Sequence, residues 1–138
     1  MTFAQADRLF EMVMECMRQA GGLYEAPSVR TQENILVALA HRHFAIRISA
    51  GRVRWFACYK RIHPEDIEEA MARNMPADII TGPIMYVSEA VNLDGPAGMA
   101  AMIKQLRKQA TGMQGLFWHR PKKNDKVLWF PSQKGKEA

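Results

Sequence analysis

The sequence predicts a single α/β domain built on a mixed sheet with helices on both faces. The chain has 138 residues, a length that suits one domain. A hydrophobic pattern of period two over 44–60 predicts two adjacent strands. An apolar run over 84–91 precedes a glycine-containing turn, a helical pattern and two further strands, which together predict a β-α-β crossover. The predicted order of elements is α-α-β-β-α-β-α-β-β.

The N-terminal part, residues 1–42, is predicted to be helical. Apolar residues recur every three or four positions over 3–20, and the pair Gly21-Gly22 ends this pattern. We interpret the methionine-rich stripe of this helix as core, or as a surface through which the chain forms a homo-oligomer. A second helix is expected over 31–41.

The sheet core is expected over 43–131, followed by a polar tail over 132–138. Its first two strands flank Ala50-Gly51, a short glycine-bearing connection that is typical of a β-hairpin. The next predicted helix begins at Pro64 and carries four acidic residues within 65–69. Carboxylates favour the positive end of a helix dipole, so these acids need no metal ion to explain them, and no metal site is expected.

Composition limits the classes of function. The formal net charge is +5, and 104–136 holds nine Lys or Arg residues against one acidic residue. Such a region favours an anionic partner, although a solvated basic surface explains it equally well. No apolar run is long enough to span a bilayer, and the N-terminus lacks a signal-peptide pattern. Because there are only two cysteines and no CxxC pair, we expect a cytoplasmic protein, or one packaged in a particle assembled there.

The turn between the apolar strand and the following helix is the main candidate for a ligand site. Backbone N–H groups at a helix start point outward together and carry partial positive charge, so they bind phosphates. Glycine lets a phosphate oxygen approach the backbone closely. The candidate cofactor-binding residues are Asn92, Gly95, Ala97, Gly98 and Arg107.

The order of elements and this turn resemble the GNAT superfamily of acyltransferases. Members of that family bind the pyrophosphate of acetyl-CoA through a loop of pattern Gln/Arg-x-x-Gly-x-Gly/Ala. The segment here reads Asn92-Leu93-Asp94-Gly95-Pro96-Ala97, in which the Gly and Ala positions match. Asn92 replaces Gln or Arg, and Pro96 removes one backbone N–H.

Residues 35–135 resemble more closely the toxin-activating lysine acyltransferases of the hemolysin type. The similar parts are the hairpin FAIRISAGRVRWFACY and the final basic hairpin GLFWHRPKKNDKVLWFPSQKG. The resemblance implies an acyl donor, either acetyl-CoA or another acyl-CoA or an acyl carrier protein, and transfer of the acyl group to an amine.

The candidate catalytic residues are Glu89 and Ser88. The toxin-activating family has a Ser-x-x-His-Arg motif near its N-terminus, and this chain lacks that motif. The resemblance places the family's catalytic aspartate on the strand before the loop, where this chain offers Ser88 and Glu89. Acyl transfer to an amine needs a base that deprotonates the nucleophile, and Glu89 or Ser88 is expected to assist this proton transfer.

Two functions remain open from the sequence. The first is an acyl-CoA- or acyl-carrier-dependent N-acyltransferase. The second is a catalytically inactive GNAT-like phage virion protein, structural or internal, that acts through contacts with other virion proteins or nucleic acid. Aromatic and basic residues combine in the last hairpin, as in proteins that hold single-stranded nucleic acid. The candidate contacts to nucleic acid or to an acidic partner are Arg120, Lys122, Lys123 and Lys126.

Overall fold

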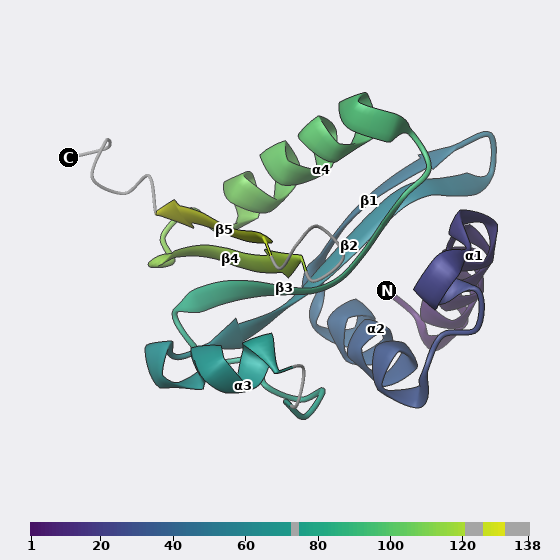
Figure 1. Ribbon diagram of the computed structural model, residues 1–138. Helices are drawn as coiled ribbons and strands as arrows, with labels where there is room; N and C mark the ends of the chain where they lie inside the picture. The colour runs from purple at the N-terminus through teal and green to yellow at the C-terminus, as the bar shows by residue number, and fades with distance from the viewer. Residues whose placement is uncertain (73–74, 121–125, 132–138) are drawn as a thin grey trace.

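A computed structural model of the chain describes residues 1–72, 75–120 and 126–131 (Figure 1). The helices and strands follow the order predicted from the sequence. The elements are α1 (Phe3–Ala20), η1 (Gly22–Tyr24), α2 (Val29–His41), β1 (Phe44–Ser49), β2 (Arg52–Ile62), η2 (Pro64–Asp66), α3 (Ile67–Met71), β3 (Ile84–Asn92), α4 (Gly95–Gln109), β4 (Gly115–Arg120) and β5 (Lys126–Pro131).

The five strands form one mixed sheet in the order β1-β2-β3-β4-β5. Neighbouring strands are antiparallel except β3 and β4, which run parallel. Helix α4 makes the connection between these two strands, because parallel neighbours need a crossover. The predicted α/β class with a central β-α-β crossover is therefore confirmed.

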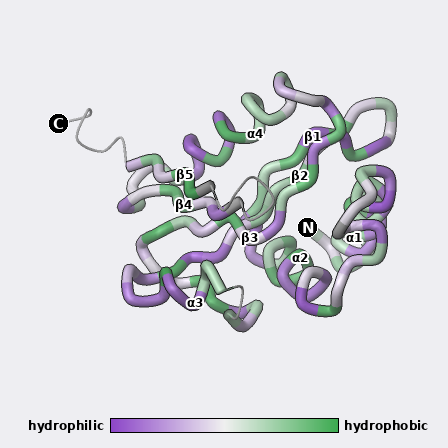
Figure 2. Tube along the Cα trace, viewed as in Figure 1, coloured by the Kyte–Doolittle hydropathy of each residue, from purple (hydrophilic) through white to green (hydrophobic). Residues whose placement is uncertain are grey.

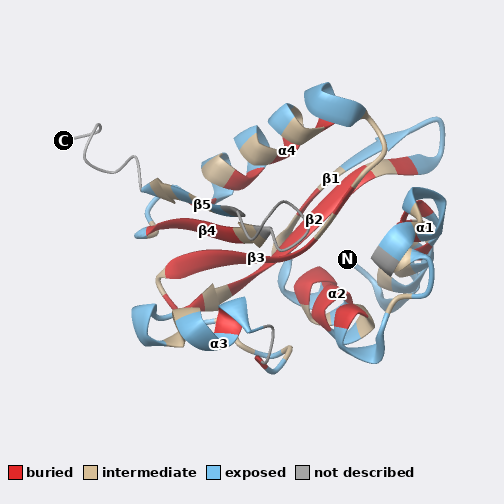
Figure 3. Cartoon of the chain, viewed as in Figure 1, coloured by how far each residue is buried: buried red, intermediate tan, exposed pale blue. Residues whose placement is uncertain are grey.

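Helices cover both faces of the sheet. Helices α1, α2 and α3 lie on one face, and α4 lies on the other (Figure 1). The strands at the centre of the sheet are buried, whereas much of the outer side of the helices is exposed (Figure 3). Hydrophobic residues run along these strands, and hydrophilic residues recur along the helices (Figure 2).

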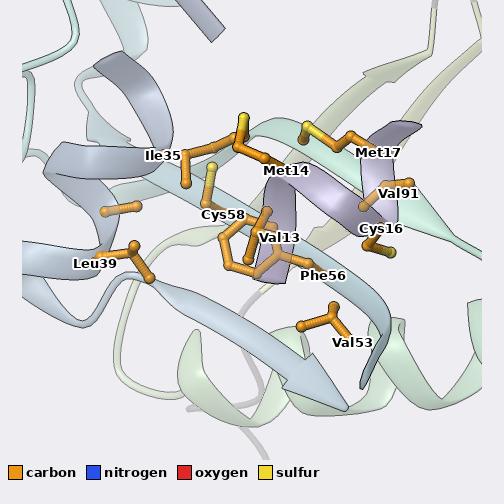
Figure 4. Packing of buried hydrophobic residues seen from close by; sticks show 11 residues of the cluster. Val13, Met14, Cys16, Met17, Ile35, Leu39, Val53, Phe56, Cys58 and Val91 are labelled. Carbon is orange, nitrogen blue, oxygen red and sulfur yellow. The ribbon is translucent and has the colours of Figure 1, made fainter. Parts of the chain in front are cut away.

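The methionines of α1 belong to the core of this chain. Met14 and Met17 are buried against α2 and the facing strands, together with Val13 and Phe56 (Figure 4). This burial supports the interpretation of the stripe as core, since these side chains do not reach the surface that a second copy would need. Phe3, at the start of the helix, is 95% exposed.

The β1–β2 hairpin closes with two residues of positive φ. Ala50 has φ 52° and Gly51 has φ 74°. Two central residues with positive φ make the turn that matches the right-handed twist of a hairpin. Glycine adopts this conformation without steric cost, but alanine does not.

A side-chain cap marks the start of α2, and a proline marks the start of α4. Helix α2 starts at Val29, two residues before the prediction, because the Ser28 hydroxyl accepts a hydrogen bond from the Thr31 N–H. Helix α4 starts at Gly95, also two residues early, with Pro96 in its first turn.

Candidate functional site

Strands β3 and β4 pair over only part of their length. Three residue pairs join them, from Ile84–Gly115 to Tyr86–Phe117. Beyond Tyr86, β3 continues to Asn92, and no further pair with β4 occurs among the described residues. The sheet therefore opens on the β4 side of the second half of β3.

The backbone of Ala90 faces this opening. In an antiparallel ladder, bonded and non-bonded residue pairs alternate. The Leu93 N–H donates to the Arg54 carbonyl at 2.8 Å, so Arg54 and Leu93 form a hydrogen-bonded pair. The next hydrogen-bonded pair lies two residues further along each strand, at Phe56 and Val91. The N–H groups of Ala90 and Asn92 consequently point away from β2. The Ala90 N–H donates to the Tyr24 hydroxyl at 3.3 Å.

A β-bulge at Ser88 orients the neighbouring carboxylate. The register of β2 against β3 shifts at this point, since Cys58 pairs with Glu89 and Tyr59 pairs with Val87. One extra residue in β3 reverses the face of every later side chain. Without it Glu89 would share the α4 face with Val87, whereas it contacts α2 and η1 instead.

The side chains of Tyr24, Thr31 and Asn34 donate hydrogen bonds to the Glu89 carboxylate, which is 2% exposed. The Tyr24 hydroxyl donates to Oε1 at 3.0 Å and the Thr31 hydroxyl to Oε1 at 3.3 Å. The Asn34 amide donates to Oε2 at 2.7 Å. Such donors compensate the cost of burying a charge and fix the direction of the carboxylate.

The groups around Glu89 stay protonated near neutral pH. Burial raises the pKa of the Tyr24 hydroxyl far above its usual range, and the negative Glu89 beside it adds to the shift. Burial likewise raises the pKa of the Cys58 thiol to about 12, again with a contribution from Glu89. Cys58 is therefore an unreactive thiol, and its Sγ lies 3.5 Å from the Ser88 hydroxyl.

A cavity of about 170 Å³ lies beside Glu89, between the sheet, α2 and α3. Its lining includes the buried residues Asn34, Lys60, Met75, Ser88 and Glu89, and the exposed residues Ser28 and Arg30. The Asn34 Oδ1 atom is buried without a hydrogen-bond partner. An unpartnered buried acceptor costs free energy unless a ligand or water satisfies it, so this cavity is suited to a hydrogen-bond donor.

The turn at Gly95 differs from the expected cluster of free amides. The Asn92 side chain accepts from the Asp94 N–H at 2.9 Å and donates to the Gly95 carbonyl at 2.8 Å. A Cβ on Gly98 would lie 2.3 Å from Asn92 Oδ1, so this glycine leaves space for the Asn92 side chain rather than for a phosphate. Arg54 bonds to the Asp94 carboxylate at 2.8 Å.

The remaining predicted residues lie apart from Glu89. Ala97 is exposed in the first turn of α4. Arg107 is twelve residues beyond Gly95 on α4, about 18 Å along the helix, and its guanidinium lies 4.8 Å from the centre of the Phe130 ring. The structure does not bring Arg107 to the turn, because that side chain packs on β5.

The basic hairpin is described only in part. Lys122 and Lys123 lie outside the described residues. For Arg120 and Lys126 the backbone is described, and these two residues pair at the open ends of β4 and β5. Trp118 is buried and Trp129 is 46% exposed, so the two tryptophans of the hairpin do not form one exposed surface.

Sequence reasoning missed Tyr24, Thr31, Asn34 and Lys60. The signal for Lys60 was its place on β2, where Phe56, Cys58 and Ile62 share its face, since an otherwise apolar set indicates a buried face. No pattern in the sequence pointed to Tyr24, which lies 65 residues from its partner Glu89.

No protein-family model matches the chain, and no curated protein matches it in sequence. In the described part of the chain, no helix is both long and apolar enough to cross a membrane. Within those same residues, no three His, Cys, Asp or Glu side chains lie together as a metal site would require.

Proposed function

We propose that the chain is a GNAT-like N-acyltransferase that takes an acyl group from a pantetheine thioester and transfers it to an amine. The observation that carries the proposal is the opening of the sheet beside Glu89. Beyond Tyr86, no described residue of β4 pairs with β3. The buried Glu89 carboxylate is one residue before Ala90, whose backbone N–H faces this opening.

The donor is held by the backbone of β3. The N–H groups of Ala90 and Asn92 face the opening and can donate hydrogen bonds to the amide carbonyls of a pantetheine arm. When the donor binds, its carbonyl replaces the Tyr24 hydroxyl as the acceptor of the Ala90 N–H. The turn at Gly95 fits a pyrophosphate less well, because Asp94 is negative and Pro96 has no N–H. This difference favours an arm attached to a carrier protein over free acyl-CoA.

Glu89 handles the proton of the acceptor. The bound donor supplies the thioester carbonyl, and the products are an amide and a free thiol. Glu89 takes one proton from the acceptor ammonium, which frees the nitrogen lone pair for attack. The second proton leaves the nitrogen as the amide forms and goes to the departing thiolate, and Glu89 then releases its proton to water. Ser88 lines the cavity beside Glu89, where the acceptor amine would bind, and has no separate role in proton transfer.

Replacement of Glu89 by glutamine tests this role. E89Q keeps the shape of the side chain and removes the base, so we expect kcat to fall by about 10²- to 10⁴-fold while donor affinity is unchanged. Thiol release from acyl-CoA and from acyl carrier protein, with a panel of amines, measures kcat, and calorimetry measures donor affinity. The matched control is E33Q, an exposed position of α2.

The proposal is contradicted if neither donor binds at millimolar concentration and the wild type releases no thiol.

One observation favours a second function in that case. The bonds of Tyr24, Thr31 and Asn34 to Glu89, which connect separate segments of the chain, and the bonds of Asn92 within its turn contribute to stability. In a non-catalytic interaction protein, neither the wild type nor E89Q would bind a donor, and the two would differ in stability alone.

A further inference from the structure

An open groove lies at the β1 side of the sheet, between the first half of α1, the start of β1 and the end of α4. Its volume is about 590 Å³, within the range of about 300–1,000 Å³ that is common for small-molecule sites. The groove shares no lining residue with the cavity beside Glu89. It is therefore a second candidate site, and the proposed acyltransferase makes no use of it.

The floor of the groove is apolar. Leu9 and Met12 of α1 and Phe44 of β1 line it, and all three are half-buried. Leu9 and Met12 are three residues apart, so they share one face of the helix. All three side chains pack against the core between α1 and the sheet, and the part of each that the core leaves uncovered lines the groove. A hydrocarbon chain lying on this floor would remove apolar surface from water.

Two arginines make the rim of the groove positive. Arg8 of α1 and Arg42, which caps the C-terminal end of α2, are exposed and line the groove. Neither guanidinium has a hydrogen bond or an ion pair with any of the described residues. Among those residues, no Asp or Glu lines the groove. Because a guanidinium is always charged and matches the geometry of a carboxylate, this rim is complementary to an anion.

The end of α4 disfavours a peptide as the ligand. An extended peptide could add a strand to the β1 side of the sheet through backbone hydrogen bonds. However, the Gln109 side-chain amide donates to the Phe44 carbonyl at 2.9 Å, so this acceptor is already bonded. The Tyr59 hydroxyl donates to Gln109 Oε1 at 3.0 Å and holds the amide in place. The groove therefore suits a ligand that needs no backbone hydrogen bonds.

We infer that the groove binds a free fatty acid, with its carboxylate at Arg8 and Arg42 and its hydrocarbon chain along Leu9, Met12 and Phe44. Two features that occur together carry the inference: an apolar floor, and two rim cations that lack partners among the described residues. A groove takes a single chain, whereas a flat or protruding apolar surface would suit a bilayer. The inference does not rest on the proposed function, since the two sites are separate.

Three matched probes separate the contributions of the chain and the charge. Decanoate carries both, decyltrimethylammonium has the same chain with a positive head group, and acetate has the carboxylate without the chain. We expect decanoate to shift the amide resonances of Arg8, Leu9, Arg42 and Phe44 in ¹⁵N spectra of the full chain, with a Kd at or below about 1 mM. The other two probes should bind about tenfold or more weakly. Equal binding of either, or no shift with decanoate at about 5 mM, overturns the inference.

Variants check that the carboxylate lies at the arginines. R42N removes one cation, and asparagine tolerates the left-handed backbone of this position, where φ is 58°. Decanoate affinity should fall about tenfold or more in R42N. The matched control is R52N, at an exposed position of β2 outside the groove, which should bind decanoate like the wild type. Unchanged decanoate affinity in R42N contradicts the assignment, and the probe comparison on the wild type stands even if R42N does not fold.

A membrane surface is the alternative occupant of this face. Phe3 is 95% exposed at the start of α1 and does not line the groove, so it would insert into a bilayer but would not contact a fatty acid in the groove. F3S should therefore leave decanoate affinity unchanged, and a tenfold loss would contradict the inference. Sedimentation with phosphatidylglycerol vesicles tests the alternative. Vesicle binding that F3S abolishes, with no decanoate shift in the wild type, would replace the fatty-acid site with a membrane-binding surface.

Discussion

Ala50 has a backbone conformation that costs an L-amino acid free energy. Its φ of 52° lies in the left-handed region, and the next residue, Gly51, also has positive φ. Asn and Gly are the residues preferred in such a turn, because Asn tolerates this conformation better than alanine. The pair Ala50-Gly51 is therefore one substitution away from the preferred Asn-Gly pair.

We expect A50N to raise the free energy of unfolding by about 1 kcal/mol, the cost of the left-handed conformation for alanine. Urea unfolding followed by circular dichroism measures the change. S49N, at the exposed end of β1, serves as control and should change stability by less than about 0.5 kcal/mol. An A50N midpoint equal to that of the wild type would show that the turn is not strained.

At this scale the sequence predicted Glu89 and Ser88 as site residues but not their partners. The partners come from segments far away in the chain, and local patterns carry no information about such contacts. Asn92 was expected to face a phosphate, yet its amide bonds to the backbone of its own turn, as short polar side chains often do.

Among the connections, the segment before β3 is held against β2 by a close backbone approach. A Cβ on Gly82 would lie 2.1 Å from the backbone carbon and oxygen of Ile62. The Gly82 N–H also donates to the Arg61 carbonyl at 3.0 Å. This glycine therefore positions the entry of β3, and through it the register that leads to Glu89.

G82A should lower the free energy of unfolding by about 1–3 kcal/mol, since the added methyl forces backbone to move. Chemical denaturation measures the loss. The adjacent exposed Thr81 gives a control, T81A, for which a change within about 0.5 kcal/mol is expected. Equal free energies of unfolding for G82A and T81A would mean that the backbone at Gly82 can move away from Ile62 without loss of stability.

Element order and type were predictable because each element carries its own periodic pattern. The period-two runs gave β1 and β2, the apolar run gave β3, and the three- and four-residue spacing gave α1. The bulge at Ser88 was not predictable, because one extra residue in a strand leaves no mark in an apolar run. The length of the β3–β4 ladder was not predictable either, since nothing in the two strand patterns marks where their pairing stops.

For the whole molecule, a partly buried histidine, His43, links stability to pH. His43 lies between α2 and β1, its ring stacks on Tyr59 at 4.9 Å, and its Nδ1 is buried without a partner. Burial lowers the pKa of His43, and the positive charges of His41 and Arg61 lower it further. The folded protein therefore binds this proton less readily than the unfolded chain.

The sign of the effect follows from linkage. The contribution of His43 to stability is complete above about pH 6.5, the pKa of an unfolded histidine, and is lost as the pH falls through the lower folded value. Thermal unfolding between pH 7.5 and pH 5 should show a smaller pH slope for H43Q than for the wild type. Parallel slopes in the two proteins would contradict this assignment.

The short ladder between β3 and β4 has a mechanical consequence. Three residue pairs at one corner connect the C-terminal hairpin to the rest of the sheet. The ladder alone therefore does not fix the width of the gap, which also depends on how Leu116, Phe117 and Trp118 of β4 pack in the core. In the proposed acyltransferase, selectivity for the acyl chain would then come from the side chains that α4 and β5 present rather than from the backbone.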